Sequence, residues 1–298
     1  MRTDVAGEKG DAQTGAVVWH RPVTYDERMV DLDLDKLQRI GQGRAAEVFA
    51  LDAGRVIKIA RDGAADLIDR EATAMRAAHA AGMPVPAVHD LVVVNGRRAL
   101  IMSRARGKDM LSGFAARPWT IMRAGAKLGR LHARLHETIA PAGLPSVKDI
   151  VEQRLRASGC VPVVARDKVI ALLRILPDGN RLCHLDFHPG NVMVDHAGMT
   201  VIDWPGAGCG DPIADVALTI MGLQGGKSPP GTPLFTRLLE PIGRKLIFRG
   251  YLRAYCKRRA IDQDLLANWL VVAAGQRLTY AIEGEQQLLL RVIERDGR

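Results

Sequence analysis

Residues 184–191 read His-Leu-Asp-Phe-His-Pro-Gly-Asn, and Val-Ile-Asp-Trp follows at residues 201–204. This stretch decides the fold because order, spacing and residue type agree: Asp186, then Asn191, then Asp203 beyond a short predicted hairpin. Phosphoryl transfer from a magnesium nucleotide requires one carboxylate that orients the attacking hydroxyl and further oxygen ligands for the metal. Asp186 matches the first requirement, while Asn191 and Asp203 match the second. The pattern therefore indicates a phosphoryl-transfer site.

The bulk composition of the chain suits a globular protein with an anionic ligand. Its 298 residues are enough for one large domain or two lobes, and an apolar content of 47% predicts a well-buried core. The net charge of +9 favours an anionic partner such as a nucleotide. We expect no nucleic-acid partner, because the sequence contains no zinc finger, RNA-recognition motif or aromatic-basic stacking pattern.

Cellular location is indicated by the cysteines and by the lack of long apolar runs. No run approaches the ~20 apolar residues of a membrane-spanning helix, so we expect no membrane partner. The cysteines form no CxxC pair, which favours free thiols in a reducing compartment: Cys160, Cys183, Cys209 and Cys256. These features predict a cytoplasmic protein, while its oligomeric state stays open.

The pattern of elements changes along the chain from strands to helices. Residues 1–30 are expected to be a flexible leader, residues 31–104 an N-terminal lobe and residues 105–298 a helical C-terminal lobe. One helix is expected in the N-terminal lobe at residues 66–81, with Gly82 as its C-terminal cap. Turn-bounded alternating segments predict strands at residues 37–40, 47–51, 55–59, 88–94 and 97–102, the last two joined by a type I′ turn at Asn95-Gly96.

Helical periodicity dominates the second lobe. Helices are predicted at residues 121–136, 147–156, 165–175, 211 onward, 242–260 and 263–291. Two short strands are expected at residues 192–194 and 200–202, and the Gly- and Pro-rich residues 224–233 predict a loop. The expected fold class is α+β, with a small antiparallel sheet and one helix in the first lobe.

A lysine and a glutamate of the first lobe suit a nucleotide site. Lys58 falls on the third predicted strand, where an ammonium can contact phosphates, and Glu71 on the next helix can hold it by an ion pair. Taken alone, Lys58 would be interpreted as an exposed strand lysine. Gly41 and Gly43 could cover the phosphates through backbone N–H groups, although an ordinary hairpin turn explains a Gly-x-Gly equally well.

Several histidines receive structural interpretations. His132 and His136 have the spacing of a zinc-protease pair, but Ala133 occupies the place of the required glutamate, so a packed or solvated helix face is favoured. His184 is expected to hold the loop that follows it through backbone groups, and Asp215 to brace this loop.

Together the motifs resemble those of the aminoglycoside phosphotransferase family, a small-molecule kinase branch of the protein-kinase-like fold. The similarity rests on the His-x-Asp-x-x-x-x-Asn run, on Ile-Asp-Trp, and on Gly210-Asp211-Pro212 with Asp215. It covers about Leu37 to about Gly222. The resemblance implies a two-lobed fold with a five-stranded N-terminal lobe, a helical C-terminal lobe and ATP between them.

The resemblance also implies roles for individual residues. Asp186 would be the catalytic base, and Asn191 and Asp203 would bind Mg²⁺. Backbone groups in the hinge between the lobes would contact the adenine edge. The implied nucleotide-binding residues, hinge included, are Gly41, Gly43, Lys58, Glu71, Ser103 and Ala105.

The chain departs from the related patterns at several points. Leu185 stands where this family often has glycine. Asp203-Trp204-Pro205 replaces the Asp-Phe-Gly of protein kinases, an Ala-Pro-Glu segment is absent, and His188 replaces a lysine two residues after the base. The last three differences favour a small-molecule kinase over a protein kinase.

The expected activity is ATP- and Mg²⁺-dependent transfer of the γ-phosphate to a hydroxyl of a small molecule, with GTP as an open alternative. A protein kinase and a non-catalytic nucleotide-binding regulatory module are the alternative classes. A polycationic aminoglycoside requires an acidic pocket, for which Glu283 and Glu285 in the last predicted helix are the nearest candidates; another hydroxylated metabolite is equally compatible. A solvated face or attraction of an anionic substrate explains the late basic cluster: Arg244, Lys245, Arg249, Arg253, Lys257, Arg258 and Arg259.

Overall fold

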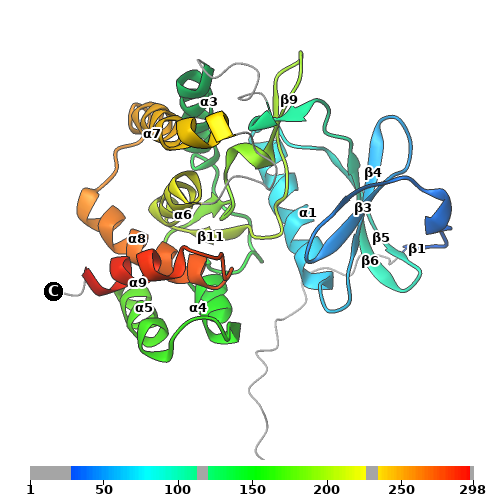
Figure 1. Ribbon diagram of the computed structural model, residues 1–298. Helices are drawn as coiled ribbons and strands as arrows, with labels where there is room; N and C mark the ends of the chain where they lie inside the picture. The colour runs from blue at the N-terminus through cyan, green and yellow to red at the C-terminus, as the bar shows by residue number, and fades with distance from the viewer. Residues whose placement is uncertain (1–27, 113–119, 226–233, 296–298) are drawn as a thin grey trace, which may run out of the picture.

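A computed structural model describes residues 28–112, 120–225 and 234–295 of the chain. Most of the expected leader and most of the expected loop at residues 224–233 lie outside the described residues. Figure 1 shows two lobes, a β-sheet lobe and a helical lobe, with helix α1 (Ala65–Ala80) between the sheet and the other helices. The predicted two-lobed α+β fold is confirmed, and the exact boundary between the lobes stays a prediction.

The sheet of the first lobe has six strands in the order β1-β5-β6-β4-β3-β2. Strand β1 pairs in parallel with β5, whereas the other neighbouring pairs are antiparallel. The implied five-stranded sheet is thus wrong by one strand, because β1 has three residues and offers no alternation to detect. The strands are β1 (Arg28–Val30), β2 (Arg39–Gln42), β3 (Ala46–Ala50), β4 (Arg55–Ala60), β5 (Val88–Val94) and β6 (Arg97–Ser103).

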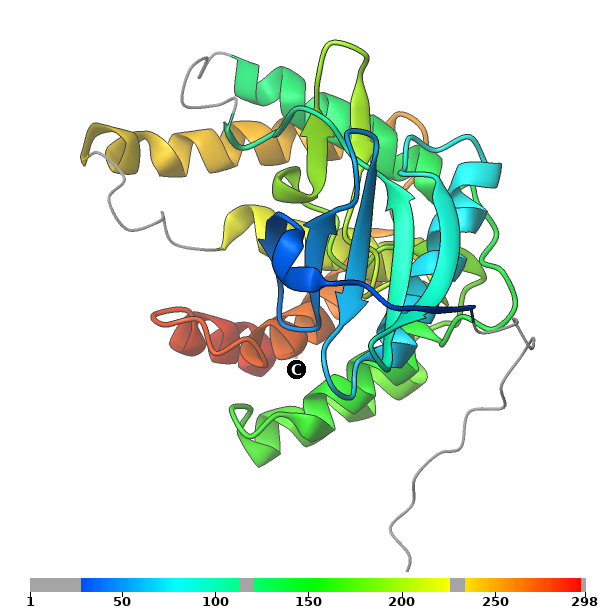
Figure 2. The same cartoon turned by 90° about the vertical axis from the view of Figure 1, so that its right-hand side faces the viewer.

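Both faces of this sheet are covered, which explains its runs of apolar residues. Helix α1 packs on one face, to which it contributes the buried side chains of Ile68 and Met75. On the other face, Ile57 and Ile59 of β4 pack with Leu34 and other apolar residues from the segment that joins β1 to β2. Figure 2 looks onto the lobe from this side. Because side chains alternate along a strand, residues next to these isoleucines point toward α1.

Two turns expected from the sequence are present. Asn95 and Gly96 have φ angles of 49° and 77°, as a type I′ hairpin turn requires. Gly82 ends α1 with a φ of 72°, and its N–H donates to the carbonyl of His79 while the next N–H donates to the carbonyl of Ala78. This pair of bonds is a Schellman cap, so both predictions are confirmed.

Helices form most of the second lobe, and two of the predicted helices have wrong boundaries. The single helix expected at residues 263–291 is interrupted at residues 279–285, where Ala281 and Gly284 take the left-handed φ values that end a helix. The helix expected from residue 242 begins earlier and contains Pro241. The helices are α3 (Ile121–Leu135), α4 (Val147–Ala157), α5 (Val163–Ile175), α6 (Pro212–Gln224), α7 (Leu234–Cys256), α8 (Gln263–Leu278) and α9 (Gln286–Arg295).

Short strands carry the loops that face the first lobe. The expected hairpin is formed by β9 (Val192–Val194) and β10 (Met199–Val201), and the order of its sheet is β10-β9-β7. The sequence analysis missed three further short strands of this lobe: β7 (Lys108–Asp109), β8 (Arg181–Cys183) and β11 (Gly208–Gly210). Strands β8 and β11 pair with each other, and β8 leads directly into residues 184–191.

Helices α3 and α7 lie side by side in both views (Figures 1 and 2). Three glycines permit this close crossing: a Cβ at Gly125, Gly129 or Gly250 would lie 2.2, 2.2 or 2.3 Å from a carbonyl oxygen of the facing helix. Among the described residues, no helix combines the length and the apolar character needed to cross a membrane.

Candidate active site

Asp215 on α6 holds the start of the loop at residues 184–191, called the Asp186 loop below. Its carboxylate accepts the N–H groups of His184 and Leu185 at 2.5 and 2.9 Å. His184 Nδ1 lies 3.3 Å from the Asp186 amide nitrogen, which donates to it, so Nε2 carries the proton and donates to the Ile202 carbonyl at 3.1 Å. The bracing roles predicted for His184 and Asp215 are confirmed.

Asn191 closes the other end of the Asp186 loop. Its Nδ2 donates to the Asp186 carbonyl oxygen at 2.9 Å and to Asp186 Oδ2 at 3.1 Å. Since Nδ2 makes both bonds, Oδ1 is the atom of Asn191 that can face a cation. The N–H of Ile202 donates to the Asn191 carbonyl at 2.9 Å, which places Asn191 beside the residue preceding Asp203.

His188 stabilises the turn within the same loop. Its Nδ1 accepts the N–H of Gly190 at 3.0 Å, and its Nε2 lies 3.6 Å from Asp186 Oδ1. His188 therefore stabilises this turn through its bond to Gly190.

Lys58 joins the two lobes at the site. It follows Ile57 in β4 and points to the opposite face of the sheet, toward α1. Its Nζ lies 2.7 Å from Glu71 Oε2 and 3.0 Å from Asp203 Oδ1. Only 10% of the Lys58 side chain is exposed, so the interpretation as an exposed strand lysine is wrong.

The ion pairs around Lys58 keep Lys58 and Asp203 charged although both are removed from solvent to different extents. Burial alone would lower the pKa of Lys58, but the carboxylates of Glu71 and Asp203 outweigh it and raise this pKa. Burial raises the pKa of Glu71, and the ion pair with Lys58 offsets this only in part. For Asp203 burial also acts upward, but the ammonium of Lys58 prevails and lowers the pKa. Asp203 is therefore an ionised carboxylate, with 47% of its side chain exposed.

A continuous set of bonds thus brings four predicted residues together. Lys58 binds Asp203, the residue before Asp203 binds Asn191, and Asn191 binds Asp186. Glu71 extends the set on the other side of Lys58, and it accepts the N–H of the residue after Asp203 at 3.2 Å.

Some backbone groups of the loop glycines and of the expected hinge are already engaged, and Gly41 lies in a strand instead of the expected turn. Gly41 lies within β2, and the Gly43 N–H donates to the Ala46 carbonyl at 2.8 Å, which closes a hairpin turn. The Ser103 N–H donates to the Ala87 carbonyl at 2.9 Å, so this amide is already engaged within the protein. Nucleotide contacts of Gly41, Gly43, Ser103 and Ala105 stay predictions.

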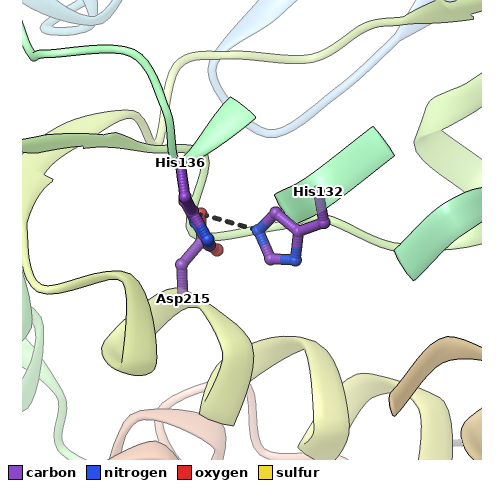
Figure 3. A group of neighbouring side chains, drawn as sticks. All are labelled: His132, His136 and Asp215. Atoms are coloured by element: carbon purple, nitrogen blue, oxygen red, sulfur yellow. Dashed lines mark hydrogen bonds and ion pairs between the residues drawn. The ribbon is translucent and has the colours of Figure 1, made fainter. Parts of the chain in front are cut away.

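A buried polar cluster lies behind the Asp186 loop. His132 of α3 and His136, the C-terminal cap of this helix, point toward Asp215 (Figure 3), and their Nε2 atoms lie 3.1 and 3.3 Å from Asp215 Oδ2. Their Nδ1 atoms lie 2.8 and 2.7 Å from the hydroxyls of Tyr251 and Tyr255 on α7. The sequence analysis predicted a packed or solvated face; the face is packed, and it is polar inside.

Three of these side chains could reach one metal ion, since ligand atoms of His132, His136 and Asp215 lie within 4.8 Å of one another. The carboxylate of Asp215 is, however, already engaged by two loop N–H groups and by the His136 ring. Burial lowers the pKa of His136 to about 4. For Asp215, burial is outweighed by the two imidazoles, and its pKa falls well below the usual value. These contacts satisfy the carboxylate without a metal, so we assign the cluster a bracing role.

The sequence analysis missed both tyrosines of this cluster. Tyr251 and Tyr255 are four residues apart, as are their partners His132 and His136, so each pair lies on one face of its helix. The equal spacing of the histidine pair and of the tyrosine pair, on two separate helices, is the signal that could have revealed the contact between them.

The acidic residues proposed for a cationic acceptor are not in a helix. Glu283 and Glu285 lie in the turn before α9. Glu285 is bonded to Arg277 at 2.5 and 2.9 Å, and each side chain of this pair is 12% exposed. The placement of these residues in the last helix is wrong, because the helix breaks at residue 279.

The two lobes and the bonded set around Lys58 and Asp186 define a protein-kinase-like fold with the site between its lobes. Residues 36–261 match the model of the phosphotransferase enzyme family, and the chain belongs to this family. It is a kinase-type enzyme, and its predicted resemblance to aminoglycoside phosphotransferases is confirmed.

Several solved structures share the fold. A choline/ethanolamine kinase family protein from Mesorhizobium loti has 18% identity and a TM-score of 0.55, over 87% of this chain and 86% of that one. Aminoglycoside-3'-phosphotransferase of type VIII has 19% identity and a TM-score of 0.58, over 81% and 93%. An aminoglycoside phosphotransferase from Streptomyces rimosus has 18% identity and a TM-score of 0.54, over 80% and 92%. Proteins with curated descriptions yielded no match.

Proposed function

We propose that this protein transfers the γ-phosphate of ATP to a hydroxyl of a small molecule in a Mg²⁺-dependent reaction. The observation that carries the proposal is the bonded set that links Lys58, Asp203, Asn191 and Asp186 across the lobes. Structures of the same fold support nucleotide use, since one similar kinase is described with AMP-PNP and Ca²⁺ and another with ADP and hygromycin B. A third is described with GDP and kanamycin, so GTP stays an alternative donor.

The side chains present fit a magnesium nucleotide. Asn191 Oδ1 and the half-exposed carboxylate of Asp203 are oxygen donors, which Mg²⁺ prefers, and the ammonium of Lys58 beside them can contact phosphates. When bound, the metal would supply positive charge to the phosphates that react.

Asp186 is proposed as the group that orients the acceptor hydroxyl and takes its proton. Its Oδ2 accepts from Asn191 and its Oδ1 faces His188, so the carboxylate has a fixed direction. Holding the reacting hydroxyl in line with the phosphate is the main contribution that such a residue makes. Removing a general base typically lowers the rate by about 10²–10⁴-fold.

The proposed acceptor is a hydroxylated small molecule rather than a protein. Similar structures are described with an aminoglycoside and with hygromycin B, and one belongs to the choline/ethanolamine kinases. Glu285 is held by Arg277, so it is not a free carboxylate for a polycationic acceptor. An acceptor panel should therefore extend beyond aminoglycosides to sugars, amino alcohols and macrolides.

The test is phosphate transfer from labelled ATP, with Mg²⁺ or EDTA, to this panel and to a protein extract. We expect a labelled small molecule with the parent protein, at most about one hundredth of that rate with Asp186→Asn, and unchanged nucleotide binding. Asp167→Asn, at an exposed position on α5, is the matched control and should act as the parent does. Label in proteins alone would favour a protein kinase, and nucleotide binding without any transfer would favour a regulatory module.

A further inference from the structure

The polar cluster behind the site holds the Asp186 loop from two sides. On one side, Asp215 accepts the N–H groups of His184 and Leu185, the two residues before Asp186. On the other side, the ring of Phe187, the residue after Asp186, stacks on the ring of His132 with centroids 4.1 Å apart and planes 9° apart. Asp186 therefore lies between two anchored neighbours.

His132 is the side chain that contacts both anchors. Its Nε2 lies 3.1 Å from Asp215 Oδ2, and its ring lies flat on Phe187. His136, one turn along α3, has the same kind of neighbours, Asp215 at 3.3 Å and a tyrosine hydroxyl at 2.7 Å. The ring of His136 contacts His132 and Tyr255 rather than Phe187.

The plane of the His132 ring is held by the bond of Nδ1 with Tyr251 and by the stack on Phe187, whereas its buried Nε2 makes no hydrogen bond within the described part of the chain. Nδ1 is bonded to the Tyr251 hydroxyl at 2.8 Å, and Nε2 faces Asp215. A fully buried imidazole costs desolvation that an apolar side chain of similar size would avoid. In return, the polar ring has a fixed orientation, and because Phe187 stacks on it, the orientation of Phe187 is fixed as well.

The backbone beside Asp186 requires such support. Leu185 has a φ of 61°, a left-handed conformation that is strained for a leucine and that persists only where surrounding contacts impose it. A shift of about 1 Å in a reacting group can lower a rate by about 10²-fold. Phe187 is bonded directly to Asp186, so a displacement of its backbone would also displace Asp186.

We propose that His132 is a positioning residue for phosphoryl transfer: anchored by Tyr251 and lying beside Asp215, it orients Phe187 and thereby the carboxylate of Asp186. This inference rests on the proposed function, and it assigns His132 and Phe187 to the reaction although neither is expected to touch a substrate.

The test compares His132→Leu with its matched control His136→Leu. Both variants remove one imidazole from Asp215 and one partner from a tyrosine, so we expect comparable losses of thermal stability. His132→Leu should also lower kcat at least about tenfold more than His136→Leu, with the KM for nucleotide within about twofold of the parent value. Equal losses of kcat in the two variants would mean that His132 has a structural role only, and would overturn the proposal.

A double-mutant cycle with Phe187→Leu tests the route of the effect. If His132 acts through Phe187, Phe187→Leu lowers kcat strongly in the parent and much less in the His132→Leu background. Fully additive effects on kcat would show that the two residues act independently and would overturn the proposal.

Hydrogen exchange of peptides that cover residues 183–191 separates this inference from the proposed function, because it needs no turnover. His132→Leu should accelerate exchange at the amides of His184 and Leu185 at least about tenfold more than His136→Leu, since opening of the loop frees these donors. Equal acceleration refutes the positioning role even if the protein transfers phosphate. A selective effect in a protein without phosphotransferase activity would uphold the anchoring and refute the function.

Discussion

Two residues of the site have left-handed backbone conformations, which large apolar side chains disfavour. Leu185 and Asp203 have φ angles of 61° and 67°. Asp tolerates the left-handed region better than most residues, because its short polar side chain can bond to the local backbone. Leucine does not, and the family often has glycine at the position of Leu185. Here the N–H of Leu185 is held by Asp215, and its side chain is 2% exposed.

Burial of Leu185 stabilises the protein, whereas its backbone strain destabilises it. The magnitudes of the two effects predict an unusual order of stability among variants at this position. Leu185→Ala should lose about 2–5 kcal/mol of unfolding free energy through lost burial. Leu185→Gly loses one further methyl group but relieves the left-handed strain, so it should be about 1 kcal/mol more stable than Leu185→Ala and still less stable than the parent. Urea unfolding measures this order. An alanine variant more stable than the glycine variant would contradict the assigned strain.

His136 predicts a loss of stability in mild acid. Burial lowers its pKa from 6.5 to about 4, so the unfolded chain binds more protons than the folded one between these pH values. The contribution to folding is complete above pH 6.5 and declines as the pH falls toward 4, by about 3 kcal/mol in total. His136→Gln should therefore show a shallower decline of unfolding free energy with pH in this window, measured by urea unfolding at each pH. Equal slopes for parent and variant would count against the lowered pKa.

At the scale of elements, the α3–α7 contact depends on residues without side chains. A Cβ at Gly129 would lie 2.2 Å from the carbonyl oxygen of Tyr251, a distance that real Cβ atoms do not adopt. Because the obstacle is backbone, the helices themselves would have to separate. Tyr251 and Tyr255 would then move away from His132 and His136, so the close crossing also sets the polar cluster.

Gly129→Ala is accordingly expected to destabilise the protein by about 1–3 kcal/mol or more, through overpacking against α7. The matched control is Gly222→Ala on α6, where an added Cβ meets nothing within 4 Å. This change should stabilise the protein by about 0.5–1 kcal/mol, because alanine favours a helix over glycine. Thermal unfolding of both variants checks whether the first change lowers the stability and the second raises it. A neutral Gly129→Ala would show that the two helices can separate at little cost.

At the scale of the whole molecule, the lobes meet through charges of opposite sign. Lys58 of the sheet bonds to Asp203 of the helical lobe, and Glu71 of α1 accepts the N–H of Trp204. A magnesium nucleotide bound here would contact both lobes. It would therefore bind the folded state and not the unfolded one. Such a ligand stabilises by about 2.7 kcal/mol at one hundred times its Kd.

We therefore expect ADP with Mg²⁺ to raise the Tm by several degrees, and ADP with EDTA to raise it less. Asp203→Asn should abolish the difference between the two conditions, because it removes the charge while asparagine still tolerates the left-handed backbone. Asp195→Asn, in the β9–β10 hairpin, is the control and should keep the full difference. A parent Tm that does not depend on Mg²⁺ would contradict the metal assignment of Asp203.

The sequence by itself determined the features whose partners are close along the chain. The spacing of Asp186 and Asn191 places both in one loop, Asn95-Gly96 determines its turn, and Gly82 ends α1. Local geometry decides these features, so short motifs predict them. The fold class followed from the same reasoning, since alternating segments dominate the first third of the chain and helical periods dominate the rest.

Only the tertiary structure decided contacts between residues far apart in the sequence. Asp203, the second partner of Lys58, is 145 residues away from it, and the tyrosine partners of His132 and His136 are each 119 residues away. Likewise, the pairing of β1 and the break between α8 and α9 leave no periodic trace that identifies them. The physical reason is the same in each case: a buried polar group is stabilised by whichever donor or acceptor the packed chain brings to it, and that choice belongs to the fold as a whole.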